Sequence, residues 1–130
     1  MKKFVKSNTQ DIFGMARVGF VDSFEVYVNT NDAGNIPHFH IRDINDWHKF
    51  HTCIEIAKAK YFHHGEKTDI LNSRQRRSLA EFMESPISNP KYGDKFSNVW
   101  ELVCFLWEIN NSQMPLPDDI EMPNYREIEL

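Results

Sequence analysis

Two histidines flank a phenylalanine in the stretch Pro-His-Phe-His, so that His38 and His40 are separated by a single residue. Side chains two residues apart on a β-strand project from the same face, about 6.6 Å apart along the strand. Both imidazoles could therefore bind one metal ion such as zinc. His51 and Glu55 are candidates for the remaining ligands, because they alternate along a later segment that could form the neighbouring strand, and an earlier strand could contribute Glu25.

The histidine pair also has a simpler explanation. His38 and His40 could merely occupy the polar face of a strand and form hydrogen bonds across it with Tyr27, Glu25 or Glu55. This arrangement is the commoner one, and the sequence contains no His-Glu-x-x-His motif of the kind found in many zinc hydrolases. Both interpretations stay open at this point.

The two cysteines, Cys53 and Cys104, lie far apart in the sequence and form no Cys-x-x-Cys motif. This spacing excludes a zinc site of four cysteines and argues against a disulfide framework. We expect both thiols to be reduced and to lie in the core. Cys53 has a histidine nearby in the sequence, but a cysteine in such a segment usually acts as a small buried hydrophobic residue.

Three arginines, Arg74, Arg76 and Arg77, lie within four residues in a segment typical of the start of a helix. They could contact phosphate or an acidic partner, and Tyr27 and Arg42 on the histidine-bearing strands are further candidates for such contacts. Alternatively, the arginines form a solvated helix face, or the acidic C-terminal segment folds back onto them.

The elements that must position these residues follow from the hydrophobic pattern. Residues 20–29 alternate in polarity and predict a strand, a turn and the histidine pair follow, and residues 50–62 predict a third strand antiparallel to the second. Helices are predicted to begin at Asn72 or Ser73 and at Asn98. We expect an α+β fold: an antiparallel sheet of three to four strands, with two helices packed on one face and the histidine-bearing face open. The inner face is predicted to carry Phe24, Val26, Phe39, Ile41, Ile54 and Ile56.

The length of 130 residues suits one domain, which we assign to residues 1–114, with an acidic, proline-containing tail over residues 115–130. The tail is either a strap over the body or a frayed end. It contains five acidic side chains and one arginine, so it accounts for the net charge of −4, and the neutral body does not favour broad nucleic-acid binding. No apolar run is long enough for a secretory signal or a membrane span, and we expect a cytoplasmic protein.

The stretches Ile-Pro-His-Phe-His-Ile, His-His-Gly and Leu-Asn-Ser-Arg resemble the pattern of the domain-of-unknown-function 4160 family, a family of small bacterial proteins. The matching residues are Pro37, His38, Phe39, His40, Leu71, Arg74, Glu81 and Phe82. The match spans about residues 27–83. The chain departs from the family at residues 42–51, where the family has a short turn, and it adds the second helix and the tail. Family members resemble partners in toxin–antitoxin-like or mobile-element gene pairs, and the family has no settled activity.

Two functions follow as hypotheses. The first is a non-enzymatic binding or regulatory protein, toxin–antitoxin-like, that pairs with another protein or with itself through a flat histidine-bearing face. The alternative is a metal-dependent hydrolase of phosphodiesters, in which the histidine pair and its neighbours hold the metal while Arg74 or Arg77 holds phosphate. The alternative requires the ligand atoms to converge on one point.

Overall fold

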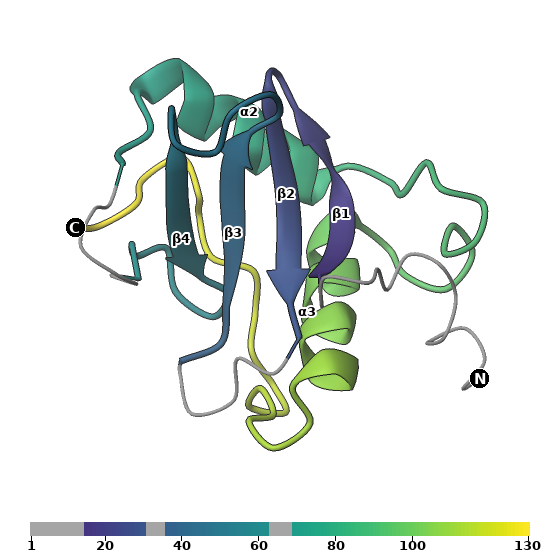
Figure 1. Cartoon of the computed structure of the whole chain (residues 1–130). Coiled ribbons are helices and arrows are strands. Elements are labelled where there is room, and N and C mark those ends of the chain that lie inside the picture. Colours follow the sequence, from purple (N-terminus) through teal and green to yellow (C-terminus); the bar gives the residue numbers. More distant parts are fainter. Residues whose placement is uncertain (1–14, 31–35, 63–68) are drawn as a thin grey trace.

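The computed structural model describes residues 15–30, 36–62 and 69–130. The described residues form four strands, β1 (Met15–Val21), β2 (Phe24–Asn29), β3 (His38–Asp43) and β4 (His51–Glu55), followed by two helices, α2 (Ser73–Glu84) and α3 (Val99–Asn110). The strands make one antiparallel sheet in the order β1-β2-β3-β4 (Figure 1). The predicted α+β fold is confirmed.

Both helices lie on one side of the sheet, together with the C-terminal segment (Figure 1). The approach is close at Gly19 of β1, where an added Cβ atom would lie 2.8 Å from the Cζ atom of Phe82 on α2. The six side chains that the sequence predicts for the inner face are all buried: Phe24, Val26, Phe39, Ile41, Ile54 and Ile56. The alternation of period two therefore identified the core face correctly.

The strand predicted over residues 20–29 is confirmed over residues 24–29 as β2, but its predicted start is wrong, because the chain reverses at Asp22 and Ser23. Val21 pairs with Phe24, and Asp22 and Ser23 form the turn between β1 and β2. Asp22 has φ of 53°, in the left-handed region that aspartate tolerates better than most side chains. β1 therefore begins at Met15, in a region for which the sequence pattern gave no clear element.

The strand predicted over residues 50–62 is also shorter than expected, since β4 ends at Glu55. The chain then turns back, and the backbone N–H of Glu55 donates to the carbonyl oxygen of Lys60 at 2.9 Å. Tyr61 forms an isolated antiparallel bridge with Ile54, and Lys60 forms a parallel bridge with Glu129 of the tail. The apparent long strand is a short strand followed by a turn.

The predicted helix starts are confirmed by the caps. The Asn72 side chain accepts from the backbone N–H of Gln75, and the Gln75 side chain accepts from the Asn72 N–H, which together satisfy two otherwise unpaired backbone donors. The Asn98 side chain caps α3 by accepting from the Glu101 N–H at 2.9 Å. The Glu101 carboxylate accepts from the N–H of Ser97.

The C-terminal tail packs as a strap over the body. The Tyr125 hydroxyl donates to the carbonyl oxygen of Ile56 at 2.8 Å and accepts from Trp100 Nε1 at 3.2 Å. Burial raises the pKa of the Tyr125 hydroxyl above its usual range. Nearby, the Arg126 guanidinium pairs with the carboxylate of Glu84 on α2. The tail therefore joins the end of β4, α3 and α2.

Candidate functional site

The register of three strands collects the polar residues on the face opposite the helices. His38 and His40 of β3 stand opposite Glu55 and Cys53 of β4, and Tyr27 of β2 stands opposite His40. Directly opposed residues share a face of the sheet, with Cβ atoms about 4.5–5.5 Å apart. The strands thus bring His38, His40 and Glu55 to one face as the sequence pattern predicted, and they add Cys53 to it.

The prediction that this face is open is wrong at its centre. The exposed fraction is 0% for His38, 2% for His40 and 6% for Tyr27. Their rings lie against one another and against neighbours: Tyr27 stacks on His40 with centroids 4.8 Å apart, and His40 stacks on His51 at 5.2 Å. Phe62 stacks on His38 at 4.4 Å. Stacked rings exclude water, so a polar strand face has become a buried cluster.

Within the described residues, His38, His40 and Cys53 form a group whose potential ligand atoms all lie within 4.8 Å of one another. Tetrahedral zinc holds neighbouring ligand atoms roughly 3.3–3.8 Å apart, as its bond lengths imply. His40 Nδ1 and Cys53 Sγ are already 3.2 Å apart. Small side-chain movements would bring the three atoms to the spacing of a metal centre, so this group could hold an ion.

The hydrogen bonds around the two imidazoles orient them. His38 Nδ1 lies 2.7 Å from the carbonyl oxygen of Ile36, which requires a proton on Nδ1 and leaves Nε2 as the nitrogen able to bind an ion. His40 Nδ1 faces Cys53, while Asn29 Nδ2 lies 3.3 Å from His40 Nε2 on the far side of the ring. His38 therefore presents Nε2, whereas both nitrogens of His40 have partners: Nε2 accepts from Asn29, which places the proton of the neutral ring on Nδ1, and Nδ1 lies between Cys53 and His51.

The two other predicted ligands lie beside this group and outside it. His51 Nε2 is 3.0 Å from His40 Nδ1 and 3.3 Å from the Tyr27 hydroxyl, and the His51 backbone N–H donates to the Asp69 carboxylate. Glu55 is buried opposite His38 but does not belong to the group of mutually close ligand atoms. His51 therefore supports the ring of His40.

Cys53 is the member of this group that the sequence pattern did not indicate. The sequence predicts a reduced core thiol, and Cys53 is reduced and buried, but it lies on the histidine side of the sheet. The signal was present in the alternation of His51, Cys53 and Glu55, which puts all three on one face of β4. Only the register shows that Cys53 stands opposite His40.

The predicted contact residues Tyr27 and Arg42 are engaged internally. Arg42 lies over the Tyr27 ring, with its guanidinium carbon 4.8 Å from the ring centroid, and its Nη2 atom is 2.9 Å from Glu25 Oε1. Arg17 pairs with the other oxygen of Glu25. The side chain of Glu25 is only 5% exposed, so this carboxylate binds two arginines at the edge of the cluster.

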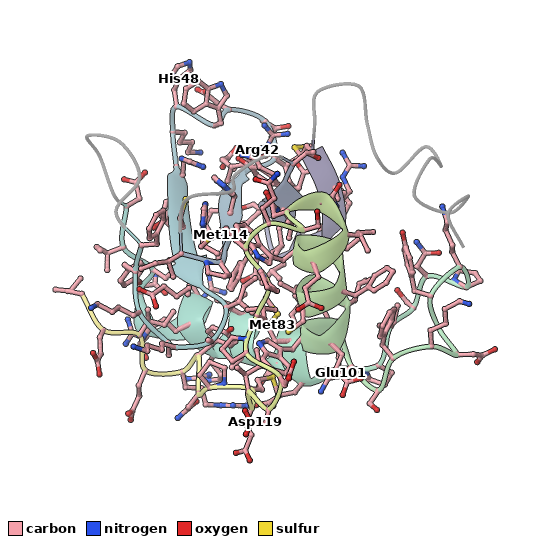
Figure 2. All side chains as sticks on the ribbon, turned by 90° about the horizontal axis from the view of Figure 1, so that it is seen from below. Arg42, His48, Met83, Glu101, Met114 and Asp119 are labelled. Atoms are coloured by element: carbon pink, nitrogen blue, oxygen red, sulfur yellow. The ribbon has the colours of Figure 1, made fainter. Side chains whose placement is uncertain are left out.

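Arg74 and Arg77 are exposed on α2, and the structure does not bring them to the histidines. Figure 2 views the molecule from below and shows Arg42 towards one side and Met83 of α2 towards the other. The sheet stands between the cluster and the helix. A phosphate held by these arginines would lie on the wrong side for an ion at His38.

The tail does reach the arginine patch of α2, but not by the predicted pairing of acids with arginines. Arg76 Nε donates to the backbone carbonyl oxygen of Arg126 at 3.0 Å, and Arg76 Nη1 donates to that of Leu71 at 2.9 Å. The second histidine pair, His63 and His64, lies outside the described residues.

Neither α2 nor α3, the helices of the described residues, combines the length and hydrophobicity that a membrane span requires. A scan against protein-family models, a search of curated proteins and a search of solved structures each found no match. The resemblance to the domain-of-unknown-function 4160 family therefore stays a prediction. The functional assignment rests on the geometry of the buried cluster.

Proposed function

We propose that the protein binds a zinc-like divalent ion through His38 Nε2, His40 Nδ1 and Cys53 Sγ. The approach of one potential ligand atom from each of the three residues to within 4.8 Å of the others, on a buried face, supports the proposal. Nitrogen and sulfur ligands favour zinc and similar transition metals over magnesium or calcium, which prefer oxygen. Binding releases the thiol proton, because the thiolate is the form that coordinates the ion. The ring proton of His40 would also have to move from Nδ1 to Nε2, with Asn29 turning its amide oxygen towards Nε2 to accept from it.

The burial of the cluster favours a structural or regulatory ion over a hydrolytic one. A hydrolytic centre keeps a coordination position open to water and substrate, whereas His38, His40 and Cys53 are each at most 2% exposed. An ion here would join β3 to β4. This supports the binding or regulatory class of function, with partner contact confined to the rim of the face, where Trp47 is 52% exposed.

The test is metal content, measured by elemental mass spectrometry on untagged protein after loading with zinc and gel filtration. The proposal expects about one equivalent per chain, in line with a single three-ligand site. The double variant His38→Ala/His40→Ala and the single variant Cys53→Ser should lose it. His48→Ala is the matched control, because His48 is exposed and lies outside the group, and it should keep the ion.

Cobalt substitution adds a readout of the ligand itself. A thiolate ligand gives cobalt a ligand-to-metal charge-transfer band, so this band should be present in the native protein and absent from Cys53→Ser. If zinc-loaded protein retains no metal, or if Cys53→Ser retains it with an unchanged cobalt spectrum, the proposed site is wrong.

A further inference from the structure

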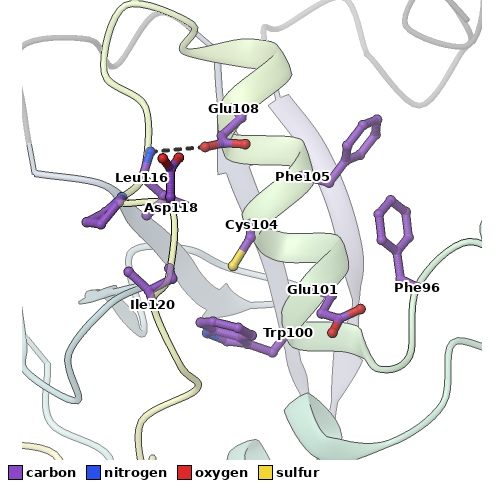
Figure 3. Close-up of a pocket in the computed structure, with 10 residues that line it drawn as sticks. Phe96, Trp100, Glu101, Cys104, Phe105, Glu108, Leu116, Asp118 and Ile120 are labelled. Carbon is purple, nitrogen blue, oxygen red and sulfur yellow. Dashed lines mark hydrogen bonds between the residues drawn. The ribbon is translucent and has the colours of Figure 1, made fainter.

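A hollow of about 360 Å³ opens between α3 and the C-terminal segment, away from the histidine cluster (Figure 3). Its walls include Trp100, Cys104, Glu108, Leu116, Asp118 and Ile120. Pockets of roughly 300–1,000 Å³ are the usual size for small-molecule sites. The side chains of His38, His40 and Cys53 do not line this hollow.

The helix side of the hollow includes a line of three side chains. Glu101, Cys104 and Glu108 recur at intervals of three and four, which aligns them along one face of α3. Figure 3 shows the Cys104 sulfur and the Trp100 ring turned to the gap, with Ile120 on the opposite wall. The floor is therefore aromatic and apolar.

The charged groups of the hollow all have one sign. Glu101, Glu108 and Asp118 are acidic, and none of the described lining residues is a lysine, an arginine or a histidine. The carboxylates of Glu108 and Glu101 accept from the backbone N–H groups of Leu116 and Ser97, at 3.1 Å and 2.9 Å, which leaves their charge uncompensated.

The thiol at the floor responds to this negative potential. Burial, reinforced by the carboxylates of Glu108 and Glu101, raises the pKa of Cys104 to about 12. The thiol is therefore neutral at physiological pH, and the floor stays apolar beneath the acidic rim. Such a combination disfavours anions and suits a ligand that is cationic at one end and apolar at the other.

We propose that the hollow binds a small organic cation, a primary ammonium group carried on an aromatic body. The ammonium group would lie between Glu108 and Asp118, where two carboxylates from different segments can both accept from it. The aromatic ring would lie in the apolar part of the hollow, beside Cys104 and Ile120. The occupant is a metabolite-sized amine.

The test is a titration with 2-phenylethylammonium, followed by backbone amide NMR and isothermal calorimetry. Saturable shifts are expected at Trp100, Cys104 and Ile120. The uncharged analogue 2-phenylethanol should bind at least about tenfold more weakly, and 3-phenylpropionate should not bind, because each lacks the cation. Titration with calcium alone checks for a site that merely collects inorganic cations.

Charge-removing variants locate the site. Glu108→Gln/Asp118→Asn should weaken the amine by about tenfold or more, while Asp119→Asn, an exposed acid next to the hollow but not lining it, should leave binding unchanged. Glu108→Gln retains an oxygen acceptor for the Leu116 N–H, so the strap should stay in place. Equal binding of 2-phenylethanol, equal weakening by Asp119→Asn, shifts produced by calcium alone, or the absence of saturable shifts would each overturn the proposal.

Discussion

The centres of the two faces of the sheet are buried to a similar extent for different reasons. On the helix side, Val26, Phe39 and Ile54 are apolar and 0% exposed, and the removal of their surface from water is itself stabilising. On the other side, His38 and His40 are equally buried although their rings carry polar nitrogens. Buried polar groups destabilise the fold unless partners satisfy them, and a metal ion would be such a partner.

Substitution on the apolar face should have the largest effect on the free energy of unfolding. Phe39→Ala should lower the free energy of unfolding by about 3–5 kcal/mol, because it removes a fully buried ring and leaves a cavity beside Tyr125. Urea denaturation in the presence of a chelator measures this loss. Ile44→Ala, at a side chain that is 48% exposed, should change little, and a loss below about 1 kcal/mol for Phe39→Ala would contradict the assignment of the core face.

The second largest effect is the stability gained on adding zinc, which should depend on the histidine face and not on the apolar face. At a free zinc concentration a hundred times the dissociation constant, the native protein should gain about 2.7 kcal/mol of stability. Cys53→Ser should lose this increment, while Phe39→Ala should keep it despite its lower baseline, since its side chain points to the other face. Denaturation with and without zinc measures both. If zinc stabilised Cys53→Ser as much as the native protein, the two faces would not differ in their response to metal.

The apolar face could be predicted from the sequence because it depends on local alternation alone. Phe39 and Ile41 keep the period of two within β3, and Ile54 and Ile56 keep it at and just beyond the end of β4. The hairpin at Asp22 could not be predicted from the sequence. Its turn residues, Asp-Ser, lack the Asn-Gly or other glycine-containing signal of the commonest two-residue turns. The pairing of Val21 with Phe24 on either side of the turn selects the left-handed conformation of Asp22.

The histidine face could be predicted only in part. Alternation placed His38 and His40 together, but the choice of Cys53 as their neighbour depends on the register between β3 and β4. Burial depends on still more distant segments: Phe62 stacks on His38, and Trp107 of α3 lies 5.5 Å from it between ring centroids. A pattern of polar residues indicates an open strand face unless such tertiary contacts are known.

A third, smaller effect concerns the carboxylate at the edge of the histidine face. Glu25→Gln should cost roughly 1–3 kcal/mol, because Arg17 and Arg42 lose the charge that both of them contact. The loss should persist in zinc, since Glu25 is not a ligand, and should depend weakly on salt, since its side chain is 5% exposed. Denaturation at low and high ionic strength measures it. Restoration of stability by zinc would place Glu25 within the metal site.

The smallest effect is expected from the exposed ion pair on the opposite side, between Glu84 and Arg126. The hydrogen bond from Arg126 lowers the pKa of Glu84 below its ordinary value of 4.5. A carboxyl group with a depressed folded-state pKa adds stability that is complete above the unfolded-state pKa and is lost as the pH falls through the folded-state pKa. Glu84→Gln should therefore lower the melting temperature slightly at neutral pH and not at all once the pH is well below 4.5.

Because both side chains are solvated, high salt should abolish the difference in melting temperature between Glu84→Gln and the native protein, in contrast to Glu25. Thermal denaturation of the two proteins across this pH range tests the contrast, and a difference that grew on acidification or survived in high salt would contradict it.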